Sequence, residues 1–332
     1  MTRLILTTSD SGAGGLRQTG LADIVVPLGF RFVWGPLPSD AELAAALAPH
    51  PAPHDQTFDR WLRNVYWKHF REVSDDDIGL LDLCERCESI ELWVDPDPNA
   101  QLTLIWLLDS LRHQKIASKL TLRQANVVIG NHFPEELAEW QLPSIAILND
   151  HPDTAGAAWQ AYRAPTPRDW FNLLSTDLSV LPQLPRAAGE LLEELPMLET
   201  GLGATETQLL EIISAGHVHP FQIIASYMRR NERRAFDYWE IGSLLDGLTH
   251  CPTPAVSGLD EGPFTLAMHD DQGRHERYGR STLSLTALGK ALLEQTDDFS
   301  RHNPIHRWWG GTELTNARLW RWDPANRALI AP

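Results

Sequence analysis

The sequence predicts an α/β fold: a Rossmann-like, mostly parallel sheet, a helical connector, and a C-terminal winged-helix domain with a Trp-rich tail. The sheet is predicted by short apolar runs at 4–6, 24–28 and 89–94 that alternate with helical stretches. Strands that alternate with helices form parallel sheets covered on both faces. The winged helix is predicted by three helices, two short strands and a closing helix after residue 203.

The length of 332 residues suits about two domains and their connections. Prolines at 165, 167, 182, 185 and 196 separate short helical stretches in the middle of the chain. We therefore divide the chain into a Rossmann-like domain at 1–150, a helical connector at 151–202, a winged-helix-like domain at 203–300, and a Trp-rich tail at 301–332.

Charge and composition narrow the function classes. The formal net charge is −16, from 44 acidic and 28 basic residues. Nucleic-acid binding depends on phosphate neutralisation, so this balance disfavours nucleic acid and anionic membranes as partners. No apolar stretch reaches the ~18–20 residues that span a bilayer. Three cysteines are too few for a disulfide framework, and we expect a cytoplasmic protein.

The first candidate loop follows the buried strand at residues 4–6. We expect a small polar loop over 8–15 and a helix that begins at Leu16. Backbone N–H groups and hydroxyls at a helix N-terminus favour an anion, and Arg17 would pair with it. A glycine-rich turn without a ligand is the alternative. The predicted ligand-binding residues of this stretch are Thr8, Ser9, Asp10, Ser11, Gly12 and Arg17.

The second candidate loop, 95–101, follows the buried strand 89–94 and precedes a helix over 102–111. Ligands of parallel sheets collect at the carboxyl ends of strands, so Asp95, Asp97 and Gln101 join the predicted site. Together with Asp10, the two aspartates could also form a three-carboxylate metal cluster for hydrolysis or group transfer. Ordinary turn and capping chemistry is the alternative. The residues predict no metal site of their own, and the cofactor is unknown.

Further elements complete the predicted N-terminal domain. We expect strands at 121–129 and 144–148, and a helix fragment that runs into a surface loop over 40–57. Apolar residues from Trp61 to Phe70 recur at helical spacing, and another helix over 75–87 is capped by Ser74.

The predicted winged helix contains helices at 205–214, 220–230 and 236–248, then strands at 264–268 and 282–285 that flank a polar segment. Its residues 203–298 include 8 basic and 14 acidic side chains. The third helix, which would enter the major groove, lacks Lys and Arg. We therefore expect a module that packs against protein. The basic cluster consists of Arg229, Arg230, Arg233 and Arg234.

Other chemical motifs have simpler interpretations. Cys84 and Cys87 form a lone pair without further zinc ligands at the expected spacing, so we expect core or surface thiols. His217 and His219 are expected in a loop. The tail should form a small hairpin with turns at 310–311 and 316–317. Its tryptophans, expected in a core rather than on a base-stacking platform, are Trp308, Trp309, Trp320 and Trp322.

A set of motifs along the whole chain resembles a bacterial family known only as a domain of unknown function. That family has an N-terminal Gly-Asp-Ser loop, a D-x-x-D-Q-L motif, a Leu-Pro connector and a W-R-W-D tail. Here Ser9 replaces the glycine and Ala100 replaces the second aspartate, which puts catalysis by this chain in doubt. The matching segments are 9–11, 35–36, 97 with 101–102, 181–182, 307–311 and 320–323.

Three hypotheses follow. The first is a ligand-binding protein that holds a small anionic molecule, nucleotide or phosphate-like, at loops 8–15 and 95–101, with read-out to a protein partner through the winged-helix domain. The second is a metal-assisted hydrolase or transferase. The third is a DNA-binding transcription regulator. The first two hypotheses require that loops 8–15 and 95–101 meet at one edge of the sheet. The third requires that the helix at 236–248 is free to enter the major groove.

Overall fold

The computed structural model describes residues 2–47 and 79–332, which form two compact units. Unit 1 consists of residues 1–32, 36–163 and 172–187, and unit 2 of residues 33–35, 164–171 and 188–332, apart from the residues outside that description. The predicted connector, 151–202, is therefore divided between both units, and the predicted tail belongs to unit 2.

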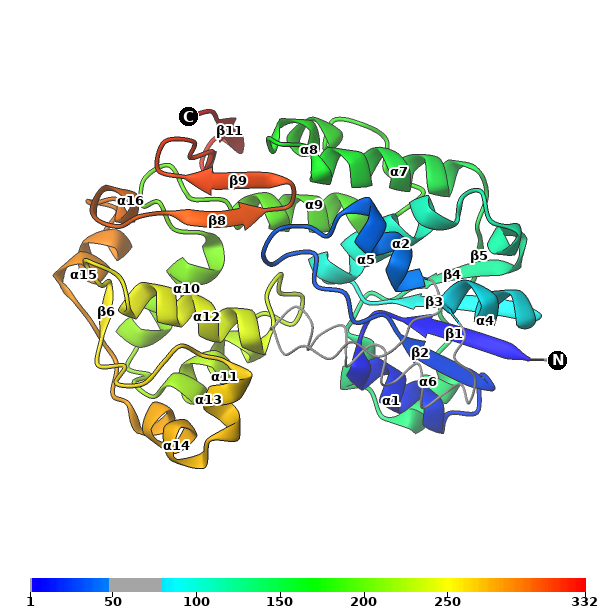
Figure 1. The fold of residues 1–332 in the computed structure, drawn as a ribbon, viewed down its shortest axis with the longest axis horizontal. Helices are drawn as coiled ribbons and strands as arrows, with labels where there is room; N and C mark the ends of the chain where they lie inside the picture. The colour runs from blue at the N-terminus through cyan, green and yellow to red at the C-terminus, as the bar shows by residue number, and fades with distance from the viewer. Residues whose placement is uncertain (1, 48–78) are drawn as a thin grey trace. The chain divides into compact units, whose positions relative to one another are not determined.

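Unit 1 is built on a five-stranded, mostly parallel sheet (Figure 1). The order is β2-β1-β3-β4-β5; β5 is antiparallel to β4 and the other neighbours are parallel. The mostly parallel α/β sheet is thus confirmed, although two predicted strands are shorter than expected. The strands are β1 (Arg3–Thr7), β2 (Ile24–Pro27), β3 (Ser89–Val94), β4 (Leu120–Gln124) and β5 (Ile145–Ala146).

Helices cover both faces of this sheet, as the alternation of elements predicts. Figure 1 shows α1 and α6 on one side of the strands and α5 and α7 on the other. The helices are α1 (Asp10–Gln18), α2 (Asp40–Leu47), α4 (Leu80–Arg86), α5 (Pro98–Leu111), α6 (Pro134–Glu139) and α7 (Asp150–Arg163). Two 3₁₀ turns, η1 (Lys115–Lys119) and η2 (Ile129–Asn131), flank β4.

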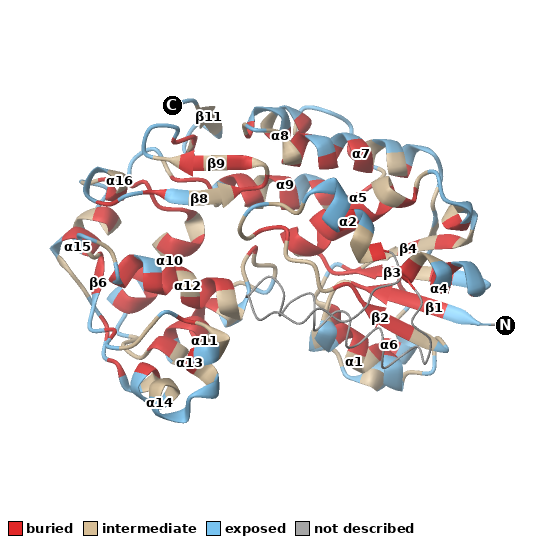
Figure 2. Ribbon diagram, in the orientation of Figure 1, coloured by how far each residue is buried: buried red, intermediate tan, exposed pale blue. Residues whose placement is uncertain are grey.

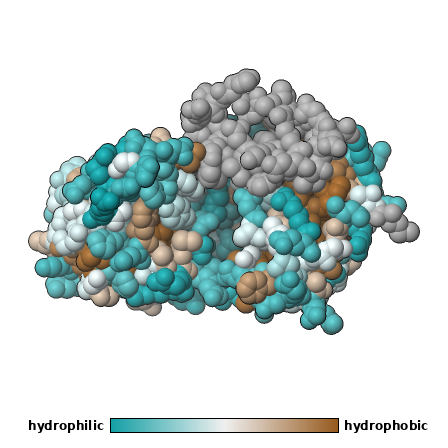
Figure 3. All heavy atoms as spheres, turned by 90° about the horizontal axis from the view of Figure 1, so that it is seen from below, coloured by the Kyte–Doolittle hydropathy of each residue, from teal (hydrophilic) through white to brown (hydrophobic). Residues whose placement is uncertain are grey.

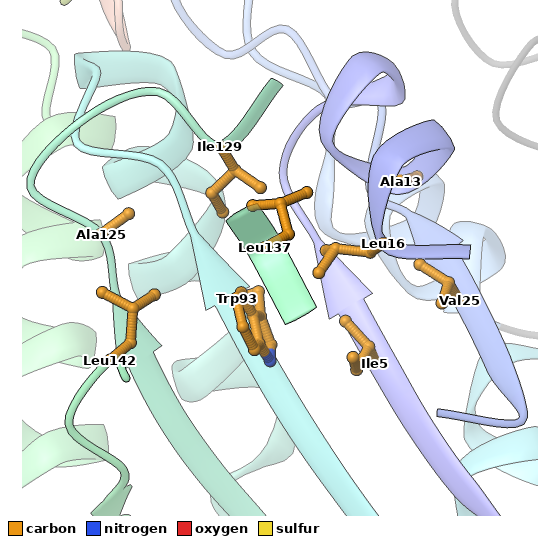
Figure 4. Packing of buried hydrophobic residues seen from close by; sticks show 9 residues of the cluster. All are labelled: Ile5, Ala13, Leu16, Val25, Trp93, Ala125, Ile129, Leu137 and Leu142. Carbon is orange, nitrogen blue, oxygen red and sulfur yellow. The ribbon is translucent and has the colours of Figure 1, made fainter. Parts of the chain in front are cut away.

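A buried apolar cluster fixes α1, η2 and α6 against the sheet. Side chains of a strand alternate between faces, so Ile5 and Trp93 point to the same side as Val25. Figure 4 shows these side chains meeting Leu16 of α1 and Ile129 of η2. Strands β1, β2 and β3 are buried over their carboxyl-terminal residues (Figure 2). The rest of the cluster is Ala13, Ala125, Leu137 and Leu142.

After residue 203, unit 2 contains three successive helices, in the order that the sequence predicts, and further helices precede them. Two short strands, β6 (Val256–Ser257) and β7 (Ser284–Leu285), pair antiparallel. The helices that lie wholly or partly in unit 2 are α8 (Arg168–Leu173), α9 (Leu184–Glu193), α10 (Ala204–Ser214), α11 (Pro220–Arg230), α12 (Tyr238–Thr249), α13 (Leu266–Asp270), α14 (Gln272–Arg280), α15 (Ala287–Leu293) and α16 (Phe299–His302).

The predicted strand 264–268 is wrong, because capping residues start helices there. Thr265 accepts a hydrogen bond from Met268 N (3.3 Å) and begins α13, and Asp271 accepts from Arg274 N (3.0 Å) and begins α14. The polar segment predicted between two strands is therefore mostly helical. Residues 256–257, rather than 264–268, pair with the second strand of the hairpin.

The aromatic hairpin predicted in the tail is confirmed. Strands β8 (His306–Trp309) and β9 (Thr312–Thr315) pair antiparallel around Gly310, whose φ of 53° suits glycine. A second pair follows, β10 (Arg321–Asp323) and β11 (Ala328–Ile330). Trp309 is buried and donates its indole N–H to Leu191 O (2.7 Å). The buried tail tryptophans are core residues of unit 2, as expected.

Some predictions fall on residues outside the described ranges. They are the loop after α2, the helical spacing from Trp61 to Phe70, and the helix start at Ser74. The described part of the 75–87 helix is α4, in which Leu80, Leu83 and Cys84 are buried.

Candidate functional site

The two predicted loops lie at the same edge of the sheet. β1 and β3 are adjacent and parallel, with Thr7 opposite Trp93. The Thr8 hydroxyl accepts a hydrogen bond from Asp95 N (3.0 Å) and donates to Asp95 Oδ2 (3.3 Å). This reciprocal pair ties the turn after β1 to the turn after β3. We call this edge, formed by residues 7–12, 95–101, 124 and 129–130, the β1/β3 rim.

At this edge, the connections that follow β1 and β3 lead to opposite sides of the sheet. After β1 the chain passes through α1 to reach β2, and after β3 it passes through α5 to reach β4. Since α1 and α5 cover opposite faces, the two connections diverge at the carboxyl ends of β1 and β3 (Figure 1). Open α/β sheets bind ligands at such a point of divergence.

Asp95 is fully buried at the β1/β3 rim. Its Oδ1 accepts a hydrogen bond from Ile129 N (2.6 Å). Burial and, to a smaller extent, the negative charge of Asp97 raise the pKa of this carboxyl to about 7, against the opposing effect of hydrogen bonds from Ile129 N, Ser9 and Thr8.

The glycine-rich stretch belongs to a helix, which corrects the predicted open loop at 8–15. α1 begins at Asp10, and the Ser9 hydroxyl caps it by accepting from Gly12 N (3.2 Å). A Cβ on Gly12 would lie 2.7 Å from Ser9 Oγ and 3.2 Å from the Ile129 side chain. Glycine is needed there for close packing, whereas Asp10 and Ser11 remain exposed.

The first turn of α1 is covered in part by the chain itself. A Cβ on Gly130 would lie only 2.0 Å from Ser11 Oγ and 3.2 Å from Gly12 N. The backbone of η2 thus rests directly against the start of α1. The predicted single polar pocket is therefore wrong in one respect: η2 and the buried Asp95 fill part of the space that the sequence assigned to a ligand.

Arg17 does not face the predicted ligand. Its guanidinium donates to Val25 O of β2 through Nε (3.4 Å) and Nη2 (3.2 Å). Arg17 lies in the last turn of α1, and cations there interact favourably with the helix dipole. The side chain lies two turns away from the helix start, so pairing of Arg17 with a bound anion has no support from this arrangement and stays a prediction.

The second loop is also shorter than predicted, because α5 begins at Pro98. Asp97 caps this helix by accepting from Ala100 N (3.0 Å). Gln101 is consequently a helix residue, and it is fully buried. Its Nε2 donates to Asp95 O (2.8 Å), while its Oε1 accepts from Gln124 Nε2 (3.1 Å). Asp95, Asp97 and Gln101 therefore remain together at the rim.

The three aspartates are not arranged as a metal site. Across residues 2–47 and 79–332, no group of three or more His, Cys, Asp or Glu side chains is placed to hold a metal ion. Asp95 uses its oxygens for Ile129 N and Thr8, and Asp97 uses one for the α5 cap. The geometry of Asp10, Asp95 and Asp97 gives the hydrolase hypothesis no support.

Two buried side-chain oxygens at the rim have no hydrogen-bond partner in the described part of the chain. They are Thr7 Oγ1 and Gln124 Oε1. Thr7 is fully buried at the end of β1, and Gln124 ends β4. A buried polar atom without a partner costs roughly 1–3 kcal/mol, so each one requires an explanation.

Sequence reasoning missed four contributors: Thr7, Gln124, Ile129 and Gly130. The signal was present, since β4 is a parallel strand and its carboxyl end lies at the same edge as those of β1 and β3. Applying the same rule to the turn after residue 124 would have brought residues 124–130 into the candidate site.

A second buried carboxyl lies in unit 2. Glu194 accepts from Thr205 N (3.2 Å) and Thr205 Oγ1 (2.6 Å), and the Tyr227 hydroxyl lies 2.8 Å from Thr205 Oγ1. Burial, with a smaller contribution from the charge of Glu206, raises the pKa of the Glu194 carboxyl to about 7, while the bonds from Thr205 and the charge of Arg307 oppose the shift. Glu194 thereby caps α10, whose own N-cap residue is Gly203.

The remaining chemical motifs have structural partners. Cys84 and Cys87 are buried free thiols, and burial raises the pKa of both, to about 12 for Cys84. His219 precedes α11, and its Nδ1 lies 3.0 Å from Ser281 O.

No described helix has the length and apolar character needed to cross a membrane.

Comparisons with known proteins identify no relative. No protein-family model matches the chain, and no curated protein sequence is significantly similar to it. The resemblance to a bacterial family of unknown function therefore stays a prediction. The candidate site is defined by its own geometry.

Proposed function

We propose that this chain is a cytoplasmic ligand-binding protein that holds a small polar molecule at the β1/β3 rim. The class to test first is the one that the sequence predicts, a nucleotide or phosphate-like compound. The observation that carries the proposal is the strand order β2-β1-β3-β4-β5, which makes the chain diverge at the carboxyl ends of β1 and β3. A Rossmann-like arrangement of unit 1 is part of this proposal.

The polar groups at that point support the same conclusion. Thr8, Asp95 and Gln101 meet there through hydrogen bonds of 2.8–3.3 Å. The Thr7 hydroxyl, which can donate or accept, and Gln124 Oε1, which can only accept, are buried without a partner among the described residues. A buried carboxyl whose pKa is raised by burial, beside such groups, is the kind of feature that accompanies functional sites.

Thermal-shift measurements with a panel of nucleosides, nucleotides and sugar phosphates test this proposal. A bound ligand raises the melting temperature, and Asp10→Ala, which alters the exposed first turn of α1, should change the shift. Asp82→Ala is the matched control, because Asp82 is also an exposed acid in the first turn of a unit 1 helix. Absence of stabilisation by every compound would overturn the proposal.

We propose a second role for unit 2: a winged-helix-like module that docks a protein and does not read DNA. The helix that would enter the major groove is α12, and its Gly242 lies against the Phe264 ring, 2.2 Å from where a Cβ would be. The Phe264 N–H also donates to the Asp246 carboxylate of α12. The segment between β6 and β7 thus packs on the would-be reading helix.

Charge supports this second role as well. Glu240 and Asp246 of α12 are buried acids, and residues 203–298 carry more acidic than basic side chains. Figure 3 shows mainly hydrophilic residues on the face of unit 2 that carries α13 and α14. A mobility-shift assay with duplex DNA at low and high salt tests it. A shift that weakens steeply with salt would show phosphate contacts and contradict the proposal.

A further inference from the structure

We propose that His269 and His275 make the packing of α13 and α14 on α12 sensitive to pH, so that mild acid releases these two helices. They belong to residues 264–280, between β6 and β7, which we call the α13–α14 segment. The release itself does not depend on the proposed docking role of unit 2. Its consequence rests on that role, because release would uncover part of α12 for a protein partner.

His269 of α13 lies among aromatic rings that join the segment to α12. Its ring centroid is 4.9 Å from that of Trp239 and 5.1 Å from that of Phe264. Its Nε2 lies 3.1 Å from the Tyr238 hydroxyl. His269, Trp239 and Tyr238 are partly exposed, so a proton can reach the imidazole from solvent. The contact of the segment with α12 therefore includes a titratable ring that is only partly shielded from water.

His275 of α14 brings a second titratable ring to the same place. Its centroid is 4.6 Å from that of His269, and it stacks on Phe221 of α11 at 4.9 Å. Like charges at this separation repel, and more strongly when they are partly removed from water. Burial and the charge of His275 lower the pKa of His269 below its usual 6.5, against the charge of Asp270. The packed segment therefore favours neutral His269.

The direction of the pH effect follows from this preference. When the segment moves away from α12, His269 enters water and takes up a proton more readily than in the packed state. A fall in pH through 6.5 therefore favours release, and the packed state is most stable above that pH. Between pH 7.5 and 5.5 one such histidine can raise the released population by up to about tenfold.

The other titratable groups at the contact do not act in this direction. Burial raises the pKa of Tyr238 to about 12 and raises that of Tyr278, so both phenols stay neutral. Asp246 of α12 accepts a hydrogen bond from Phe264 N. Burial raises the pKa of this carboxyl, against that bond and the nearby His250. Protonation of Asp246 in acid therefore favours the packed state and opposes the effect of His269.

Ion pairs on the outer side of α14 persist over the same pH range. Glu261 accepts from Arg274 Nε (3.0 Å) and from Arg277 Nη2 (2.8 Å). These hydrogen bonds lower the pKa of Glu261 from its usual 4.5, so the carboxylate stays charged at pH 5.5. Loss of these pairs cannot account for release in mild acid, which leaves the histidine pair as its cause.

Hydrogen–deuterium exchange of the full chain at pH 7.5 and 5.5 tests the inference, with labelling times scaled for the change in intrinsic exchange rate. We expect amides of the α13–α14 segment to lose about three- to tenfold of their protection at pH 5.5. Amides of α15, also in unit 2, are the internal reference and should keep theirs. Equal protection of the segment at both pH values, or an equal loss in α15, would overturn the inference.

Variants assign the effect to the histidines. His269→Phe keeps a ring and removes the titration, so its segment should stay protected at pH 5.5, or gain protection through Asp246. His306→Phe, the same change at an exposed histidine of the tail hairpin, is the matched control and should behave as the wild type. A wild-type loss in His269→Phe contradicts the inference.

His275→Phe decides if His269→Phe does not fold. It removes the repulsion but leaves His269, so its segment should lose less protection than that of the wild type, and an equal loss overturns the inference. Such a failure leaves the docking role of unit 2 standing. Salt-sensitive binding of duplex DNA would instead contradict that role and leave the pH effect intact.

Discussion

Asp95 of unit 1 and Glu194 of unit 2 are buried carboxyl groups with pKa values raised to about 7, yet their surroundings differ. Each acid has a second carboxyl nearby, Asp97 for Asp95 and Glu206 for Glu194, but Glu194 also has a cation, Arg307, whose charge favours its ionised form. Glu194 caps a helix. Asp95 lies where parallel strands end, among buried oxygens that the described chain leaves unpaired. A raised pKa by itself therefore does not identify a ligand site, and of the two acids only Asp95 belongs to the site that we propose.

The largest expected effect comes from truncating the two acids. Glu194→Ala leaves Thr205 N without its acceptor, and Asp95→Ala does the same to Ile129 N. Each should lower the free energy of unfolding by about 1–3 kcal/mol, measured by urea denaturation. Only Asp95→Ala should also change ligand binding. A binding defect in Glu194→Ala would remove the distinction between the two acids.

The next effect is a dependence of stability on pH. Both carboxyls have a higher pKa in the folded chain than the usual 3.8 for Asp or 4.5 for Glu, so the folded state holds more protons between pH 4 and 7. Stability contributed by these groups is therefore present at low pH and is lost as pH rises towards 7, by at most about 1.4 kcal/mol per unit and group.

Asp95→Asn and Glu194→Gln should each flatten that dependence, measured as the urea midpoint at several pH values from 4.5 to 8. Binding of a ligand at the rim should shift the slope contributed by Asp95 and leave that of Glu194 unchanged. Slopes identical to the wild type in both variants would show that other groups dominate.

A comparable loss of stability is expected where η2 packs against α1. Gly130→Ala places a Cβ 2.0 Å from Ser11 Oγ, so η2 or the start of α1 must shift, at a cost of about 1–3 kcal/mol. Gly14 lies within α1, and a Cβ there would have no atom within 4 Å, so Gly14→Ala should instead stabilise the fold by roughly 0.5–1 kcal/mol. Equal melting temperatures for the two variants would mean that η2 does not rest on α1 in solution.

The smallest effect is expected at Arg17. Arg17→Ala removes two long hydrogen bonds to Val25 O at an exposed position, and should cost less than about 1 kcal/mol. Ligand affinity at the rim should not change, because the side chain points away from it. A tenfold loss of affinity for a phosphate-bearing compound would restore Arg17 as an anion partner.

The sequence predicts the strands that form the rim, but not where its helices begin or how η2 packs against α1. The alternation of apolar runs and helices places β1 and β3 correctly, because buried strands need continuous apolar stretches. The helix starts at Asp10 and Pro98 were missed, since Ser9 and Asp97 act as caps whose hydrogen bonds override the turn character of the residues that follow. The contact of Gly130 with Ser11 joins residues 119 positions apart and has no local signal.

Unit 2 was harder to predict for a related reason. The apolar run 264–268 has the composition of a strand, but Thr265 caps a helix and Phe264 packs on Gly242 of α12. Tertiary packing and capping decide between helix and strand when a segment is only five residues long. The tail hairpin was predictable because Gly310 lies at a turn between two short, largely aromatic and β-branched runs.

The hydrogen bond from Trp309 to Leu191 O has a consequence for biosynthesis. Trp322 likewise pairs with the 196–198 segment, through its N–H to Pro196 O and its carbonyl to Leu198 N. Both partners leave the ribosome more than a hundred residues before these tryptophans do. The core of unit 2 therefore cannot be completed until the end of the chain has been synthesised. In contrast, all strands of the unit 1 sheet have been synthesised by residue 146.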